Sequence, residues 1–262
     1  MNTSAILQMT AHRAYPLPRG PWIMTQQWQD LLFIHFPLAP EILRPFIPAE
    51  IDLDTFDGQA WIGIVPFRVS RTNLRWLPSP FLSPFPEINV RTYVTYQGIA
   101  GVYFFSLDAA NLLAVIGART LFHLPYFFAR MSCREYQGAF YYHSERRLTQ
   151  SFAAYDGMYR PTGAVFFAER GTLEYWLVER YCLYTVTKNK RVYRVDIHHA
   201  PWPLQLAEQT CKRNTMALAQ GIVLPERPPL LHFAQEQDVL FWPLRYISSA
   251  YPPVESPPHF VI

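Results

Sequence analysis

Residues 87–107 read EINVRTYVTYQGIAGVYFFSL, two runs rich in β-branched and aromatic residues on either side of Gln97-Gly98. Such runs favour strands, and a short turn containing glycine between them is typical of a β-hairpin. We therefore predict antiparallel strands at Asn89–Tyr96 and Gly101–Leu107.

The same signals recur along the chain. After a turn at Asp57-Gly58, the sequence predicts a strand at Gln59–Val69. It predicts two further hairpins: Ala129–Tyr136 with Phe140–Arg146 around Gln137-Gly138, and Tyr181–Thr187 with Arg191–His198 around Lys188-Asn189-Lys190. Many hairpins with few helices indicate a mainly β fold, either an antiparallel barrel or a sandwich, and we favour the barrel.

Four short helices are also expected, each bounded by a residue that begins or ends helices. They are Pro37–Ile47 before Pro48, Ala109–Phe122 capped by Asp108, Leu173–Arg180 capped by Thr172, and Leu204–Gln220 before Gly221.

The composition suits one large core. Half of the 262 residues are hydrophobic, only 16% are charged, and there are 19 Phe, 16 Tyr and 7 Trp. No repeat or flexible linker divides the chain, so we predict a single domain at residues 21–250, after an extended arm at residues 1–20 and before a tail at residues 251–262. The most apolar window, Ile99–Ile116, contains Ser106, Asp108 and Asn111 and does not predict a membrane span.

Charge and cysteine usage narrow the class of protein further. A net charge of +3 is too small for a nucleic-acid surface. The cysteines, Cys133, Cys182 and Cys211, form no C-x-x-C pair, which favours a reducing cytoplasm over a disulfide framework. The histidines show no metal-ligand spacing, and we expect neither a metal nor a cofactor. Apolar edges of β domains often pair, so we expect a homodimer.

One strand carries a polar row. Period-two geometry places Glu87, Asn89, Arg91 and Tyr93 on one face, while the residues between them, from Ile88 to Val94, lie on the other. The pattern alone leaves open whether the polar row meets water or faces inward.

From about Trp28 to Trp242 the chain resembles the YqjF-like family of uncharacterised bacterial proteins. The resemblance rests on His35-Phe36, LRPFIPAEIDLDTFDGQAWIGIVPF, FPEINVRTYV, GVYFFSLDAA, AR-x-x-F-x-LPY, ERYCLYT and HHAPWPL. That family is distantly similar to acetoacetate decarboxylase. The similarity implies a cone-shaped antiparallel barrel around a buried pocket, with the pocket on the Glu87 strand and the segment after Arg119.

The resemblance also implies a missing nucleophile. Acetoacetate decarboxylase uses a lysine after a turn, and the resemblance puts Tyr126 and Phe127 at the lysine positions. Neither side chain can form the imine that Schiff-base decarboxylation requires. The lysines of this chain, Lys188, Lys190 and Lys212, follow no matching motif.

If the pocket persists, Glu87 is the candidate acid or base, and Tyr126 is the candidate hydrogen-bond donor or general acid. Arg91 or Arg119 would anchor an anion, because a guanidinium donates two parallel hydrogen bonds to a carboxylate. Asn89, Tyr93 and His35 complete the candidate binding residues. Two structural alternatives stay open: an ion-pair network of Glu87 with Arg91 that tethers the strands, and a surface role for Arg119.

Three functions are consistent with these residues. The first is a barrel that binds a small organic acid or ketone. The alternative is a lyase, hydratase or isomerase that acts on an oxo-acid through Glu87 and Tyr126. A third is a protein-interaction module that presents the aromatic side chains of Trp22, Trp76 and Trp202.

Overall fold

The hairpin predicted around Gln97-Gly98 forms in the computed structural model of the protein, which describes residues 2–77, 79, 82, 84–148 and 152–247. Gln97 and Gly98 have φ values of 51° and 75°. Gln137 and Gly138 repeat this conformation, with φ values of 49° and 74°. Two consecutive positive φ values are what a two-residue hairpin turn of type I′ requires, so local turn chemistry accounts for both hairpins.

Within the described residues, 13 strands join into one sheet. They are β1 (Met24–Leu38), β2 (Asp52–Leu53), β3 (Ala60–Leu74), β4 (Phe85–Tyr96), β5 (Ile99–Ala109), β6 (Tyr126–Tyr136), β7 (Ala139–Arg146), β8 (Ala154–Phe166), β9 (Cys182–Val186), β10 (Val192–His198), β11 (Leu204–Asn214), β12 (Leu230–Phe241) and β13 (Arg245–Ile247). The helices are α1 (Thr3–Gln8), α2 (Pro40–Leu43), α3 (Leu112–Leu121) and α4 (Leu173–Val178), with 3₁₀ turns η1 (Arg44–Phe46) and η3 (Leu218–Gln220). The predicted mainly β class is confirmed.

Two strands change partners halfway and split the sheet into two rings. One edge of β5 pairs with β4, whereas the other edge pairs first with β9 and then with β6. In the same way β12 pairs with β1 on one edge and with β11 and β10 on the other. The first ring therefore runs β4-β5-β9-β10-β12-β1-β3, and the second replaces β9 and β10 with β6, β7, β8 and β11. Among the described pairings, those of β5 with β6 and β9 are parallel, and the others are antiparallel.

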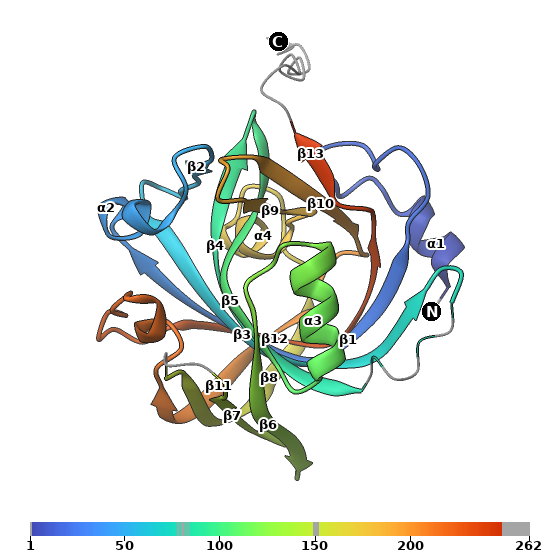
Figure 1. Ribbon diagram of the computed structural model, residues 1–262. Coiled ribbons are helices and arrows are strands. Elements are labelled where there is room, and N and C mark those ends of the chain that lie inside the picture. The colour runs from blue at the N-terminus through green and yellow to red at the C-terminus, as the bar shows by residue number, and fades with distance from the viewer. Residues whose placement is uncertain (1, 78, 80–81, 83, 149–151, 248–262) are drawn as a thin grey trace, which may run out of the picture.

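Figure 1 shows the first ring in the upper half of the view, with α3 crossing in front of it, and the strands β6, β7, β8 and β11 below. Each ring encloses its own core. Phe33, Phe67 and Trp202 belong to the core of the first ring, whereas Ile88, Tyr159 and Phe233 belong to that of the second. The strands β12, β1, β3, β4 and β5 form the wall shared by both.

Because β4 lies in that shared wall, neither of its faces meets bulk water. Ile88 and Val90 pack in the second ring. Glu87 and Asn89 are only 4% and 5% exposed and face the first ring. The structure thus resolves the alternative that the sequence left open, and the polar row points inward.

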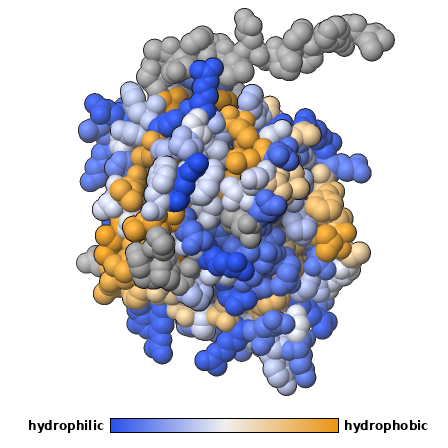
Figure 2. Space-filling model, turned by 90° about the vertical axis from the view of Figure 1, so that its right-hand side faces the viewer, coloured by the Kyte–Doolittle hydropathy of each residue, from blue (hydrophilic) through white to orange (hydrophobic). Residues whose placement is uncertain are grey.

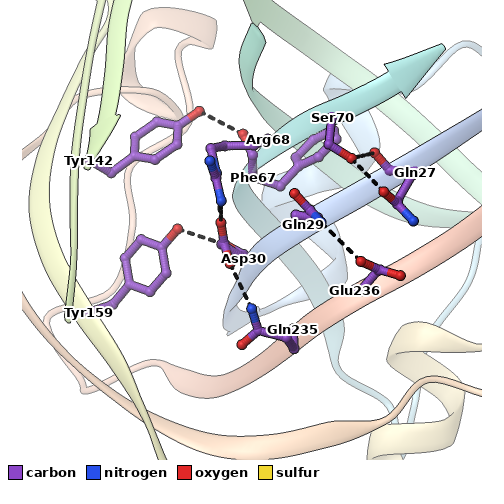
Figure 3. Close-up of polar contacts among 10 residues, drawn as sticks. All are labelled: Gln27, Gln29, Asp30, Phe67, Arg68, Ser70, Tyr142, Tyr159, Gln235 and Glu236. Carbon is purple, nitrogen blue, oxygen red and sulfur yellow. Dashed lines mark hydrogen bonds and ion pairs between the residues drawn. The ribbon is translucent and has the colours of Figure 1, made fainter. Parts of the chain in front are cut away.

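A bulge in β1 lies at the centre of a hydrogen-bonded cluster that links strands of the shared wall. Asp30 has a φ of 55°, and the pairing of β1 with β3 shifts register beside it. Its carboxylate accepts hydrogen bonds from Arg68 Nε at 2.6 Å and Gln235 Nε2 at 3.1 Å, and its carbonyl accepts one from Tyr159 Oη at 2.7 Å (Figure 3). Burial raises the pKa of Asp30, against these hydrogen bonds. The cluster joins β1, β3, β8 and β12.

Three of the helix predictions need correction. Leu204–Asn214 is strand β11, paired with β8, and only η3 follows it. Asp108 lies in β5, while Asn111 caps α3 by accepting a hydrogen bond from Ala114 N at 3.0 Å. In the predicted helix Pro37–Ile47, the strand β1 continues through Leu38 and only α2 and η1 are helical. The helix capped by Thr172 is confirmed, although α4 ends at Val178.

The first twenty residues are not extended throughout, because Thr3–Gln8 form α1. Ile6 of this helix packs on Leu240 and Trp242. The predicted tail at residues 251–262, and the last three residues of the predicted domain, lie outside the described residues. No helix in the described part of the chain is long and apolar enough to cross a membrane.

The surface view in Figure 2 shows hydrophilic side chains across the middle of one face and hydrophobic side chains toward its edges. Large apolar side chains that are exposed include those of Leu112, Leu113, Ile116 and Leu121, all on α3. An exposed apolar helix therefore lies over the first ring.

Candidate functional site

The first ring encloses a small cavity, with about 90 Å³ accessible to the centre of a water-sized molecule. Small-molecule sites are usually hollows lined by apolar side chains with a few polar groups. Most of the wall here is apolar, from β1, β3, β5 and β9, and the polar groups come mainly from β4 and the segments next to α4.

The polar row of β4 supplies Glu87, Asn89 and Arg91 to this cavity. At about 3.3 Å per residue, the backbone from Glu87 to Arg91 spans about 13 Å, so these groups lie at different depths. Gly63 on β3 leaves room for the arginine, because a Cβ there would lie 3.4 Å from Arg91 Cγ and 3.2 Å from His35 Cδ2. The polar row therefore depends on a glycine in the neighbouring strand.

Glu87 contacts Tyr126 of β6, whose hydroxyl donates a hydrogen bond to Glu87 Oε2 at 3.0 Å. Burial raises the pKa of Glu87 to about 8; the tyrosine hydrogen bond opposes this, and the charge of Asp108 adds to it. Burial also raises the pKa of Tyr126 well above its ordinary value. At neutral pH the pair is therefore uncharged, a carboxylic acid next to a phenol. Within the described residues no ion pair joins Glu87 to Arg91, so the strand-tethering network considered from the sequence is absent there.

A second arginine reaches the cavity from the segment after α4. Arg180 Nη1 donates to Asp54 Oδ2 at 2.6 Å, and its Nε donates to Trp176 O at the same distance. Its guanidinium lies 4.3 Å from the centre of the Trp176 ring and 5.0 Å from that of Tyr93. These contacts fix the guanidinium and leave Nη2 without a hydrogen-bond partner among the described residues.

Three further buried polar atoms of the cavity wall have no partner in the described part of the chain: Asn89 Oδ1, Arg91 Nε and Trp202 Nε1. Buried polar groups are usually hydrogen-bonded, because leaving one unpaired costs about 1–3 kcal/mol. Three N–H donors and one amide oxygen in one cavity therefore form a site ready to bind a polar ligand.

Tyr93 and His35 lie behind this wall. The Tyr93 hydroxyl and His35 Nε2 are 2.7 Å apart, both residues are fully buried, and neither lines the cavity. Burial, followed by the charge of Arg91, holds the pKa of His35 well below its ordinary value. The neutral imidazole thus supports Tyr93, over which Arg91 lies at 5.8 Å from the ring centre.

Arg119 does not join the cavity. Its side chain is exposed on α3 and borders a separate surface hollow between α3 and β6. The lysines also lie elsewhere: Lys188, Lys190 and Lys212 are all exposed, and none lines the cavity. Among the described residues, no group of three or more His, Cys, Asp or Glu side chains is placed to hold a metal ion.

Arg180, Trp202 and His199 line the cavity, although no pattern in the sequence assigns them there. The interaction-module alternative requires Trp202 at the surface, yet this side chain is 3% exposed and its ring centre lies 5.0 Å from that of Phe33, edge to face. Burial lowers the pKa of His199 to about 3. All three residues lie in the segments ERYCLYT and HHAPWPL, so the motifs that carried the family resemblance already contained them.

Comparison with known proteins identifies the family of this chain. The model of the DUF2071 family, described as an uncharacterized conserved protein, matches residues 25–238. The uncharacterized protein YqjF of Bacillus subtilis is 53% identical over 230 residues, which cover 87% of this chain and 94% of that protein.

Solved structures share the fold at low identity. Acetoacetate decarboxylase from Legionella pneumophila superimposes with a TM-score of 0.59 at 13% identity, covering 90% of this chain and 93% of that one. The enduracididine biosynthesis enzyme MppR, complexed with pyruvate, gives 0.59 at 10% identity, covering 91% and 95%. This chain has the fold of these proteins and belongs to the DUF2071 family.

Proposed function

We propose that this protein binds a small organic acid or ketone in the cavity of the first ring, with the carboxylate or carbonyl oxygen between Arg91 and Arg180. The observation that carries the proposal is the set of buried N–H donors that have no partner among the described residues, Arg91 Nε, Arg180 Nη2 and Trp202 Nε1. A carboxylate is the group that such donors bind best, because guanidinium and carboxylate oxygens form parallel, charge-assisted hydrogen bonds.

The charges in the cavity favour an anion. Asp54 neutralises Arg180, whereas no carboxylate of the described residues forms an ion pair with Arg91. Because the pKa of Glu87 is raised to about 8, this side chain adds no negative charge at neutral pH. One positive charge is thus left uncompensated in a buried site, where an anionic ligand would gain most. The complex of MppR with pyruvate adds that a barrel of this fold accommodates a small oxo-acid in that protein.

Thermal shift measurements with pyruvate, acetoacetate and butanoate test the proposal. A ligand present at a hundred times its dissociation constant should raise the melting temperature of the wild type by roughly 5–10 °C. Arg91→Met should abolish that shift while keeping the length of the side chain. Arg119→Met is the matched control, since this arginine is exposed outside the cavity, and it should respond like the wild type. If no acid stabilises the wild type, or if Arg91→Met responds fully, the proposal is wrong.

The Glu87 and Tyr126 pair favours a second candidate, an acid–base lyase, hydratase or isomerase acting on an oxo-acid. The two side chains are hydrogen-bonded at 3.0 Å. In the reaction the Tyr126 hydroxyl would turn from Glu87 to the carbonyl oxygen and give it the proton, while the ionised glutamate takes the proton from the neighbouring carbon. As a base, Glu87 must be ionised, so the rate should rise with pH up to about 8. Exchange of the pyruvate methyl protons in D₂O, followed by NMR, should show this rise in the wild type and none in Glu87→Gln.

The proposal also includes the expectations from the sequence on imine chemistry, cellular location and oligomeric state. Decarboxylation through an imine is not proposed, because the three lysines lie outside the cavity. The free thiols of Cys133, Cys182 and Cys211 suit the proposed cytoplasmic location. The proposed homodimer is checked by light scattering after size-exclusion chromatography.

A further inference from the structure

A second hollow adjoins the cavity, with about 160 Å³ accessible to the centre of a water-sized molecule. It lies beneath α3, and we call it the outer chamber. Most of the side chains that line it are apolar; they include Met24, Leu74, Phe85, Leu113, Phe122 and Val195. Its polar lining residues are Gln26, Thr72 and Tyr126. The outer chamber therefore suits an apolar group, in contrast to the inner cavity.

The two spaces share part of their wall. Gln26, Leu124, Tyr126, Leu183 and Phe241 line both of them. Along β4 the order runs from Phe85 in the outer chamber to Glu87, Asn89 and Arg91 in the inner cavity, a distance of about 20 Å along the strand. Moving inward from α3, a ligand would meet carbon first, then the Glu87 and Tyr126 pair, and last the two guanidinium groups.

The face that α3 turns to the outer chamber combines three small residues, Ala114, Gly117 and Ala118, with Leu113 and Leu121. A Cβ added at Gly117 would meet no heavy atom within 4 Å. At Gly117 the helix therefore leaves space where a larger side chain could fit.

We propose that the ligand is an elongated monocarboxylic acid. Its carboxylate binds at Arg91 and Arg180, and its apolar chain lies in the outer chamber under α3. This inference rests on the function proposed above. Removing hydrocarbon from water is favourable in proportion to the area buried, so each further methylene should add affinity until the outer chamber is full. A three-carbon acid would use only the inner cavity.

Calorimetric titration of the full chain with straight-chain carboxylates from butanoate to decanoate tests this inference. Affinity should rise about fourfold per methylene, the equivalent of ~0.8 kcal/mol of burial. Gly117→Leu should fill the outer chamber and weaken decanoate at least tenfold while leaving butanoate unchanged. Ala118→Leu, on the same lining face, should act in the same way. Thr120→Leu, an exposed position on α3 outside that lining, is the matched control and should bind every acid like the wild type.

The outcomes separate this inference from the proposed function. Binding of butanoate with an affinity that does not rise with chain length overturns the outer-chamber inference and leaves the acid site intact. Unchanged decanoate binding in both Gly117→Leu and Ala118→Leu overturns it as well. Decanol binding as tightly as decanoate, with no effect of Arg91→Met, overturns the proposed carboxylate site. If no acid binds, both the proposed function and the outer-chamber inference are wrong.

Discussion

At the scale of single residues, the buried carboxyl groups of Glu87 and Asp108 differ in their partners. Glu87 has no cationic partner among its described contacts, and burial keeps it protonated near neutral pH. Asp108, one strand away, is instead paired with Arg146, whose Nε and Nη2 donate to its two oxygens at 2.8 and 2.7 Å. Both side chains of that ion pair are fully buried. The neutral Glu87 faces the cavity, whereas the ionised Asp108 links β5 to β7 through its ion pair with Arg146.

Breaking this ion pair from one side should be costly. In Arg146→Met the Asp108 carboxylate remains buried without its cation, and removing one partner of a buried pair costs about 3–5 kcal/mol. The double variant with Asp108→Asn should recover part of that loss, because an amide is cheaper to bury than an unpaired carboxylate. Urea denaturation of the two variants and the wild type measures both effects. A loss below about 1 kcal/mol in Arg146→Met would contradict the assignment.

At the scale of elements, the parallel contact between β5 and β9 closes the first ring. Gly101 on β5 makes this contact possible, because a Cβ there would stand 2.7 Å from Cys182 Sγ and 2.8 Å from Cys182 O. The clash involves backbone as well as side chain, so it cannot be relieved by one rotamer change. Ring closure therefore depends on the absence of a side chain at this crossing.

Two glycine variants compare the crossing with α3. Gly101→Ala should destabilise the protein by about 1–3 kcal/mol through overpacking. Gly117→Ala, in a helix with no atom near the added Cβ, should stabilise it by roughly 0.5–1 kcal/mol, because alanine loses less chain entropy than glycine. Denaturant midpoints report both changes. Equal effects at the two positions would show that the crossing is looser than described.

Elements also differ in how far their sequence predicts them. Turn residues such as Gln97-Gly98 act locally, so the hairpins and the polar row of β4 were predictable, whereas the direction of that row needed the second ring behind it. Leu204–Asn214 has apolar residues that fit either a helix or a strand, and only its pairing with β8 decides for the strand. Arg180 and Trp202 come to the cavity from segments about ninety to more than a hundred residues beyond β4. Nothing local to those segments indicates which barrel wall they join.

At the scale of the whole molecule, the free energy of unfolding should have a maximum at an intermediate pH and fall on either side of it. The pKa of Glu87 is raised from 4.5 to about 8, so the folded state holds an extra proton and stability falls as pH rises to about 8. Burial lowers the pKa of His198 and His199 from 6.5 to about 4 and about 3. There the unfolded state binds more protons, so stability falls as pH drops below 6.5.

A stability maximum near pH 7 follows, since burial also lowers the pKa of His35 and His232, and below that value four histidines outweigh one glutamate. From there to pH 8 the loss should stay below about 1 kcal/mol, because Glu87 itself deprotonates over this interval and each proton contributes ~1.4 kcal/mol per pH unit. Chemical denaturation from about pH 5 to about pH 9 measures the profile. Glu87→Gln should flatten the alkaline side and leave the acid side unchanged. A wild-type profile that rises steadily to pH 8 would contradict the raised pKa of Glu87.

Because the two rings share one wall, neither ring can close during translation until the last strand of that wall has been made. The strands β1, β3, β4 and β5 leave first, but β12, at Leu230–Phe241, is the strand that pairs with β1 and so completes either circle. Until that last stretch has been translated, the nascent chain carries open strand edges and two uncovered apolar interiors, which are the features that chaperones bind. A premature stop codon anywhere before β12 would therefore leave both rings open and both cores exposed.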